Sequence, residues 1–307
     1  EIGRNRNFVP ITLKENLGWR DMARVEVNTP ALPGIMIDVG RSRRYLHGKH
    51  AAHILGYVSP VPEEQEQSDP LMKLPGFRVG RSGIERMHEH VLRGTGGRSE
   101  VEVNAYGRVI RELSRQEGQP GAEVTLSIDI SLQKAIEKRL SNKSASVVVM
   151  NANSGDILAM TSSPSFDPNL FNKGLTHEEW DELISNERSP LINKAIGGVY
   201  SPGSTFKMIV LLAALEKGVI TSQSKIFCRG YEELGDAKFH CWRKGGHGLV
   251  DAENAISQSC DVFFYGIAKK IGIEKIAVMA RRFGLGVRSG IDLDGEKAGL
   301  VPTKEWK

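Results

Sequence analysis

The sequence has no apolar run as long as the roughly 18 residues of a membrane-spanning helix, so we expect none of its segments to cross a membrane. It has no secretory signal pattern at its start, no internal repeat and no low-complexity tract. It also has no strong excess of one charge, since the formal net charge is +4 and the basic residues are scattered. The densest basic stretch, residues 40–44, is typical of a solvated turn. The weak and scattered positive charge argues against nucleic acid as a partner.

The composition that is present is that of an ordinary globular protein. Hydrophobic residues make up 40% and charged residues 25% of the 307 positions, which is enough chain for two domains with a sizeable core. The chain starts at Glu1 without a methionine and stops at Lys307 without a tail. We therefore expect a piece of a longer protein, from which an N-terminal membrane anchor has been removed.

A polar segment with glycine and proline, residues 115–121, predicts a domain boundary near residue 120. Before it, hydrophobic patterning predicts a helix over 11–22, strands over 24–27 and 34–39, a helical segment over 47–57, a polar loop over 61–78, a helix over 88–92 and a hairpin of 99–103 with 108–113. After it, the pattern predicts a strand over 123–128, a helix over 129–140 and a hairpin of 146–150 with 156–160. This order predicts an α+β fold, with a mixed α/β module over 1–120 and helices laid on an antiparallel sheet over 121–307.

The pattern Ser-x-x-Lys occurs three times, beginning at Ser131, Ser204 and Ser222. The first lies inside a predicted helix and the third in a polar connector, and both are typical of chance matches. Ser204 differs, because a turn precedes it and an apolar run over 206–215 follows it. An apolar pattern on all faces predicts a helix buried in the middle of its domain, with Ser204 at its N-terminus.

On such a helix Ser204 and Lys207 lie on one face. Burial disfavours the charged form of a lysine, and a neutral amine is a workable base for a serine nucleophile. Free N–H groups at the helix N-terminus suit a developing oxyanion. The alternative is structural, with Ser204 as a helix cap and Lys207 extending to solvent. The context alone leaves both interpretations open.

A serine nucleophile of this type needs a second proton relay, and Ser259-Cys-Asp261 is a candidate. Alone, this pattern favours a helix cap, because Ser-x-Asp also begins at Ser127, Ser154 and Ser165. In combination the two patterns carry more weight. Ser-x-x-Lys, then Ser-x-Asn or Ser-x-Asp, then Lys-Thr-Gly is the motif order of penicillin-binding proteins and class A β-lactamases.

Further segments resemble class B penicillin-binding proteins. In the first module they are Gly80-Arg-Ser-Gly-Ile-Glu85, Leu92-Arg-Gly94 and Asn104-Ala-Tyr-Gly107. Around the candidate site they are residues 190–196, Tyr200 to Lys207, His247-Gly, Ser259-Cys-Asp-Val-Phe-Phe-Tyr265 and Pro302-Thr-Lys-Glu-Trp306, which look most like the penicillin-binding protein 2 type. The resemblance covers nearly the whole chain, most loosely before residue 45.

The resemblance implies a peptidoglycan D,D-transpeptidase of cell-wall elongation, on the periplasmic face of a bacterial inner membrane. Ser204 would attack the penultimate D-alanine carbonyl of a stem peptide, and β-lactams would acylate the same serine. Lys207 would take the proton of Ser204, and Ser259 would pass a proton to the leaving nitrogen. Asp261 would position the substrate or the lysine; it replaces the asparagine of the wider superfamily, as is common in the penicillin-binding protein 2 type. The first module would be a non-catalytic pedestal that contacts the glycan polymerase and the scaffold proteins of elongation.

The third motif is missing, since neither Lys-Thr-Gly nor Lys-Ser-Gly occurs. Lys297-Ala-Gly299 is superficially close but comes too early for the family's strand. We expect the motif and its oxyanion N–H to follow Lys307, and this chain alone to be inactive. Two alternatives keep the same serine: a β-lactam-sensing binding domain, and a D,D-carboxypeptidase or β-lactamase.

The three cysteines of the sequence lie close together, and with His247 they form the series Cys228, Cys241, His247, Cys260, spaced x12, x5, x12. Three thiolates and one imidazole are the ligand set of a closed, structural zinc site. Glycines on both sides of His247 give its backbone the freedom to aim the ring, and His240 is a competing ligand. Zinc would fix the turn that presents Ser259 and Asp261, because Cys260 lies between them.

Two alternatives to zinc stay open. In an oxidising periplasm Cys228 and Cys241 would form a disulfide across the hairpin between them, which leaves Cys260 as a buried thiol. Otherwise the three cysteines are unrelated small core residues.

Overall fold

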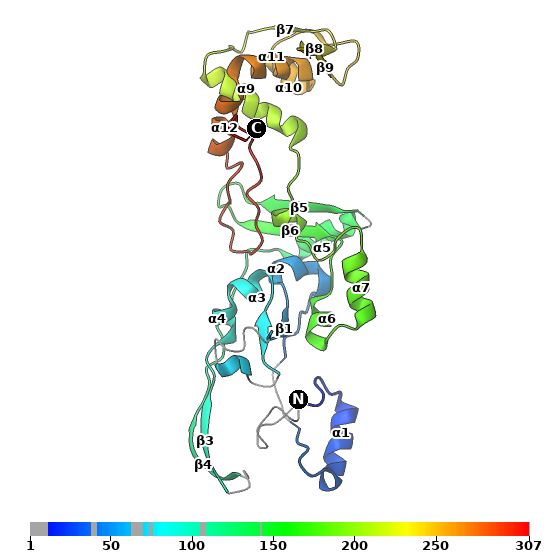
Figure 1. The fold of residues 1–307 in the computed structure, drawn as a ribbon, viewed down its shortest axis with the longest axis vertical. Coiled ribbons are helices and arrows are strands. Elements are labelled where there is room, and N and C mark those ends of the chain that lie inside the picture. The colour runs from blue at the N-terminus through cyan, green and yellow to red at the C-terminus, as the bar shows by residue number, and fades with distance from the viewer. Residues whose placement is uncertain are drawn as a thin grey trace. The chain divides into compact units, whose positions relative to one another are not determined.

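The structure is a computed structural model that describes residues 12–37, 42–62, 70–73, 76–104, 109–141 and 143–306 (Figure 1). The chain divides into two compact units. The N-terminal unit comprises Glu1–Gly197 with Asp292–Gly295, and the C-terminal unit comprises Gly198–Ile291 with Glu296–Lys307. The domain boundary predicted near residue 120 stays a prediction. Parts of the predicted strand over 34–39, of the loop over 61–78, of the turn over 104–107 and of the basic stretch over 40–44 lie outside the described residues.

The first part of the N-terminal unit is built from short helices and two separate antiparallel strand pairs, β1 with β2 and β3 with β4. Its elements are α1 (Trp19–Asn28), η1 (Thr29–Ala31), η2 (Gly48–Ala51), α2 (Ala52–Leu55), β1 (Val58–Pro60), η3 (Pro70–Lys73), β2 (Arg78–Gly80), α3 (Gly83–Met87), α4 (Glu89–Arg93), β3 (Arg98–Val103) and β4 (Val109–Gln116). The hairpin predicted over 99–113 and the helical segments predicted over 47–57 and 88–92 are confirmed.

Two strand predictions in this unit are wrong. The segment over 24–27 belongs to helix α1, since Met22 and Val25 follow the helical spacing and four alternating residues are too few to define a strand. The segment over 123–128 runs beside β6 (Ile157–Ser163) without joining it as a strand. A side-chain hydrogen bond connects this segment to β6, in which the Ser127 hydroxyl donates to the Ile157 carbonyl over 2.8 Å. Residues 35–37, in the other predicted strand, have no regular structure.

The second part of the N-terminal unit lays helix α5 (Ile130–Leu140) against a hairpin of β5 (Ala145–Met150) and β6. The helix predicted over 129–140 is confirmed, and Asp129 caps it by accepting hydrogen bonds from the N–H groups of Ser131 and Leu132. The remaining elements are α6 (Pro168–Lys173), α7 (His177–Ser185) and α8 (Lys194–Gly197).

Gln133 of α5 links three segments from a position that is only 2% exposed. Its side-chain oxygen accepts from the Met160 N–H over 2.9 Å, and its amide donates to the carbonyls of Met160 and His50 over 2.8 and 3.0 Å. The side chain thereby satisfies the outward backbone groups of β6 as a neighbouring strand would. It also ties the η2 segment to the hairpin.

The C-terminal unit packs helices around one core and carries two further strand pairs. Its elements are η4 (Gly203–Phe206), α9 (Lys207–Glu216), β7 (Ile226–Cys228), β8 (Tyr231–Leu234), β9 (Ala237–His240), β10 (Gly248–Val250), α10 (Ala252–Ser257), α11 (Asp261–Ile271) and α12 (Ile273–Arg282). Helix α9 packs against α11 and α12. The antiparallel pairs are β7 with β10 and β8 with β9, which confirms the hairpin predicted between Cys228 and Cys241.

Helix α9 is not buried on all faces, so this expectation is wrong. It buries Ile209, Val210, Ala213 and Ala214 against α11 and α12. Its other face is open, with Met208 54% and Leu212 41% exposed. Among the described residues, no helix is both long enough and apolar enough to span a bilayer.

Replacing Gln133 by alanine would leave the Met160 N–H and C=O and the His50 C=O without their partner. Each buried polar group left unpaired costs about 1–3 kcal/mol, less where water enters. We expect Gln133→Ala to lower the free energy of unfolding of this unit by roughly 2–4 kcal/mol. Urea denaturation measures it, and Lys134→Ala, at the next, exposed position of the same helix, is the control. Equal stability of the two variants would contradict the role given to Gln133.

Candidate active site

Ser204 lies in the 3₁₀ turn η4, and Lys207 is the first residue of α9. Gly203, just before the serine, has a left-handed backbone with φ of +56°, which glycine adopts without strain. The Thr205 hydroxyl donates to the Pro202 carbonyl over 2.6 Å and closes the turn. The sequence Ser-Pro-Gly-Ser-Thr thus places the serine hydroxyl at the entry to a helix whose inner face is anchored in the core.

Ser259 follows α10 in a left-handed conformation, with φ of +52°. The Cys260 N–H donates to the Ala255 carbonyl and the Ser259 N–H to the Ile256 carbonyl, over 2.9 and 3.0 Å. These two bonds form a Schellman motif, whose left-handed position is usually a glycine. A serine here is strained by about 1–2 kcal/mol. Strain that persists in a folded chain points to a functional requirement, here for the hydroxyl.

The structure brings the four predicted catalytic side chains together. The hydroxyl oxygens of Ser204 and Ser259 lie 2.8 Å apart. The Lys207 ammonium donates to the Ser259 hydroxyl over 2.9 Å and to the Ser259 carbonyl over 2.8 Å. It also donates to the Asp261 carboxylate over 2.6 Å. Within the described chain, no hydrogen bond joins Ser204 to Lys207 directly, so the connection runs through Ser259.

The surroundings of Lys207 differ from those expected. We predicted an apolar environment, but the amine is surrounded by the Ser259 oxygens and the Asp261 carboxylate, and it faces the Phe264 ring at 5.6 Å. Burial alone raises the pKa of Asp261, but the hydrogen bonds from Lys207 and from the Trp242 N–H outweigh it and lower the pKa. The carboxyl is therefore ionised at neutral pH, and the lysine is held by an ion pair.

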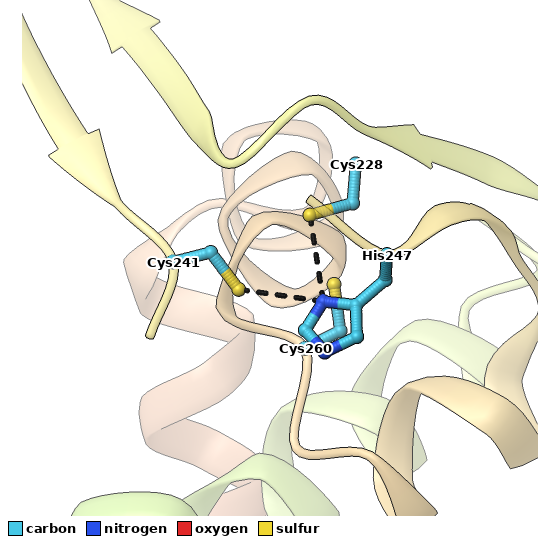
Figure 2. Close-up of side chains that lie close together, drawn as sticks. All are labelled: Cys228, Cys241, His247 and Cys260. Atoms are coloured by element: carbon cyan, nitrogen blue, oxygen red, sulfur yellow. Dashed lines mark hydrogen bonds between the residues drawn. The ribbon is translucent and has the colours of Figure 1, made fainter. Parts of the chain in front are cut away.

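Cys228, Cys241, His247 and Cys260 form a second cluster beside this network (Figure 2). Their ligand atoms all lie within 4.8 Å of one another, and the cysteines are buried. The Nδ1 atom of His247 lies 3.6 Å from the sulfurs of Cys228 and Cys241. All three cysteines are free thiols in the structure. His240, the competing ligand, is outside the cluster.

The geometry of this cluster fits a tetrahedral metal ion. A sulfur at 2.3 Å and a nitrogen at 2.0–2.1 Å from zinc, in tetrahedral directions, lie about 3.6 Å apart. Burial raises the pKa of Cys228, but N–H groups of His247 and Gly230 outweigh it and lower the pKa, which favours the thiolate. Burial raises the pKa of Cys260 to about 12, so a metal would displace that proton. Burial and the Arg243 charge lower the pKa of His247, which is then a neutral imidazole.

Close backbone contacts shape the loop that carries His247. Gly246 and Gly248, on either side of it, are both left-handed, with φ of +76° and +72°. A Cβ atom on Gly246 would lie 2.1 Å from the Cys228 carbonyl oxygen, and one on Gly230 would lie 2.2 Å from that of Lys244. Only glycine permits this approach, so the strand ends that carry Cys228 and His247 meet closely.

Sequence analysis missed one member of the site, Trp242. Its backbone N–H donates to Asp261 over 3.0 Å, and its indole N–H donates to the Gln258 carbonyl over 3.0 Å. Its ring lies against His247, with centroids 5.3 Å apart. The position next to Cys241 is the one signal that the sequence offered.

Comparison with known protein families identifies two domains. Residues 145–307 match the penicillin binding protein transpeptidase domain, which is more than half of the chain. Residues 3–126 match the penicillin-binding protein dimerisation domain. The second match covers most of the module that we predicted as a pedestal.

Individual relatives point to the same family. The chain is 38% identical over its whole length to the peptidoglycan D,D-transpeptidase MrdA of Escherichia coli K12, and it spans 50% of that protein's length.

Among solved structures, penicillin-binding protein 2 of Helicobacter pylori in its complex with MreC matches with a TM-score of 0.87 and 32% identity, covering 94% of this chain and 55% of that one. Pseudomonas aeruginosa PBP2 in complex with WCK 5153 matches with a TM-score of 0.74 and 36% identity, covering 89% of this chain and 58% of that one. This chain belongs to the penicillin-binding protein family, and among its members it is similar to penicillin-binding protein 2.

Proposed function

We propose that this chain is part of a peptidoglycan D,D-transpeptidase, with Ser204 as the nucleophile. One observation carries the proposal: the Ser204 hydroxyl lies 2.8 Å from that of Ser259, which in turn is 2.9 Å from the Lys207 amine. Of the three Ser-x-x-Lys patterns, the one at Ser204 has its serine and its lysine both within hydrogen-bond distance of the same hydroxyl, that of Ser259. The similarity to MrdA supports the reaction class.

The reaction would proceed in two steps. Lys207 first gives up the extra proton of its ammonium group to solvent. The Ser204 oxygen then attacks the penultimate D-alanine carbonyl of a stem peptide, and the neutral Lys207 amine accepts the hydroxyl proton directly or through Ser259. Ser259 passes a proton to the leaving nitrogen, which departs as free D-alanine and leaves an acyl-enzyme ester. An amine from a second stem peptide then attacks the ester carbonyl and forms the cross-link. The bond to the Ser204 oxygen breaks, and the proton that the amine loses passes to that oxygen. Asp261 holds the lysine amine in place during both steps.

The chain does not supply every part of such a site. It has no Lys-Thr-Gly or Lys-Ser-Gly, the third motif of these enzymes. One face of α9, next to Lys207, exposes Met208, Leu212 and Leu215. An exposed apolar face on a helix that carries the nucleophile is suited to cover by the rest of the domain. We propose that the remainder of the full-length protein covers this face and brings the third motif to Ser204.

We propose that the first module serves as a pedestal that contacts the elongation machinery. As one partner we propose a scaffold protein, and the solved complex of the H. pylori relative with MreC supports a protein partner. As a second partner we propose a membrane glycan polymerase, which the similarity to a solved peptidoglycan synthase complex of polymerization and crosslinking supports. Because the substrate lies outside the inner membrane, we place the active site on the periplasmic face.

We also propose that Cys228, Cys241, His247 and Cys260 hold a structural zinc ion. The four ligand atoms are of the types that zinc prefers, and their number would complete a tetrahedral coordination, with no position left open for a catalytic water. When bound, the ion would join three segments of the chain through its ligands. It would fix β7, the end of β9 and the turn at Cys260 to one another.

Acylation of Ser204 is testable with a fluorescent penicillin on the full-length protein. We expect Ser204→Ala to abolish covalent labelling, since no other side chain provides the nucleophile. The matched control is Ser222→Ala, in an exposed Ser-x-x-Lys pattern, which keeps normal labelling. Labelling of Ser204→Ala at the normal rate would exclude Ser204 as the nucleophile.

The isolated chain is a second test, because it holds two of the three motifs. We expect it to react with the fluorescent penicillin at least about 100-fold more slowly than the full-length protein, since removing one oxyanion donor alone costs about 10²–10³ in rate. Time courses on gels measure both proteins. Equal rates would show that the segment beyond Lys307 contributes nothing to acylation.

The metal is testable by elemental analysis of the chain purified without added reductant. We expect one zinc ion per chain. X-ray absorption fine structure should give zinc distances of about 2.3 Å to sulfur and 2.0–2.1 Å to nitrogen. Cys260→Ser should lose most of the zinc, whereas His240→Ala, outside the cluster, should retain it. A zinc-free protein with a mass two units low would instead indicate the Cys228–Cys241 disulfide.

A further inference from the structure

The conformation of Ser259 depends on the peptide group that precedes it. The angle φ of Ser259 is a rotation about its N–Cα bond, so it is fixed when the Gln258–Ser259 peptide plane and the following segment are both held. The N–H of that plane donates to the Ile256 carbonyl, and the Cys260 N–H fixes the following segment by donating to Ala255. The carbonyl of the plane belongs to Gln258, and it accepts the indole N–H of Trp242 over 3.0 Å.

Trp242 also acts on the far side of Ser259. Its backbone N–H donates to the Asp261 carboxylate over 3.0 Å, and the other oxygen of that carboxylate binds Lys207. The two N–H groups of Trp242 thus bind Gln258, the residue just before Ser259, and Asp261, two positions after it. The ring edge packs on His247, although 64% of the side chain is exposed. So exposed a tryptophan contributes little to the core, and its polar contacts account better for its orientation.

We infer that Trp242 is a positioning residue for the second motif, holding Ser259 in its strained left-handed turn through the indole N–H and Asp261 toward Lys207 through the backbone N–H. The inference rests on the proposed function, since it gives Ser259 and Asp261 their roles in acylation. The hydrogen bond from the indole N–H to the Gln258 carbonyl holds the peptide plane before Ser259, and so helps to set the direction of the Ser259 hydroxyl. It thereby acts on the proton path from Ser204, without touching the substrate.

The test separates the indole N–H from the rest of the residue. Trp242→Phe in the full-length protein keeps the backbone N–H and an aromatic ring at His247, and it loses the indole donor. We expect the acylation rate constant with a fluorescent penicillin to fall roughly three- to tenfold, as for one lost hydrogen bond. The labelling amplitude should stay at one per protein, and the zinc content should match that of the wild type. Trp19→Phe, in helix α1 of the first module and at a position that is 77% exposed, is the matched control and should retain the normal rate.

The outcomes separate this inference from the proposed function. A normal rate constant for Trp242→Phe would overturn the inference while Ser204 acylation stands. So would a reduced amplitude with a normal rate constant, which indicates a purely structural role. Absence of Ser204 labelling in the wild type would instead overturn the proposed function. If Trp242→Phe does not fold, benzothienylalanine at position 242, which keeps the ring size and lacks the N–H, gives the same comparison.

Discussion

The left-handed turn at Ser259 is the constraint on which the site depends. The turn joins the end of α10 to the start of α11. The change of chain direction there allows three consecutive residues to contact different parts of the site. The hydroxyl of Ser259 faces Ser204 and Lys207, the sulfur of Cys260 faces the thiol cluster, and Asp261 returns to the lysine. A right-handed continuation would rotate the following side chains away from these partners. Glycine would make the turn more easily, but it would remove the hydroxyl.

Packing in the core sets the separation of the two halves of the network. Ser204 comes from the turn η4 just before α9, Lys207 from the first residue of α9, and Asp261 from the first residue of α11. The two helices pack directly on each other. Phe263 and Ile267 of α11 are fully buried. The Lys207–Asp261 pair is itself partly buried, with 13% and 24% of the side chains exposed. Because desolvation offsets much of the attraction in such pairs, this one contributes to position more than to stability. The core, with its larger apolar area, holds the helices.

Much of this arrangement was predictable from local sequence. The hairpins, the capped helix α5 and the position of the Ser-x-x-Lys serine at a helix start follow from periodicity and capping residues, which act over a few positions. The cluster of Cys228, Cys241, His247 and Cys260 was predictable because its ligand types are few in the chain. Its closeness in space needed the glycine contacts at Gly230 and Gly246, and these pair segments that are far apart in sequence.

Other features depend on tertiary contacts and were out of reach. Trp242 has no motif, and its two hydrogen bonds exist because β9 ends next to the Ser259 turn. The polar surroundings of Lys207 come from α11, which no helical pattern around α9 could reveal. The strand expected over 123–128 failed for a related reason, since strand formation depends on which partner is available at the edge of β6 and Gln133 already satisfies part of that edge.

The thiol cluster and the polar network of Ser204, Lys207, Ser259 and Asp261 meet at the same turn. Helix packing fixes how far apart α9 and α11 lie, and the N–H groups of Ser259 and Cys260 tie the turn before α11 to the end of α10. A zinc ion bound to Cys241 and Cys260 would add a further restraint, because it joins the turn to the strand end that carries Trp242. The metal would then need no contact with substrate to matter for acylation. It would act by limiting the turn at Ser259 to the conformation in which the Ser259 hydroxyl lies within hydrogen-bond distance of both Ser204 and Lys207.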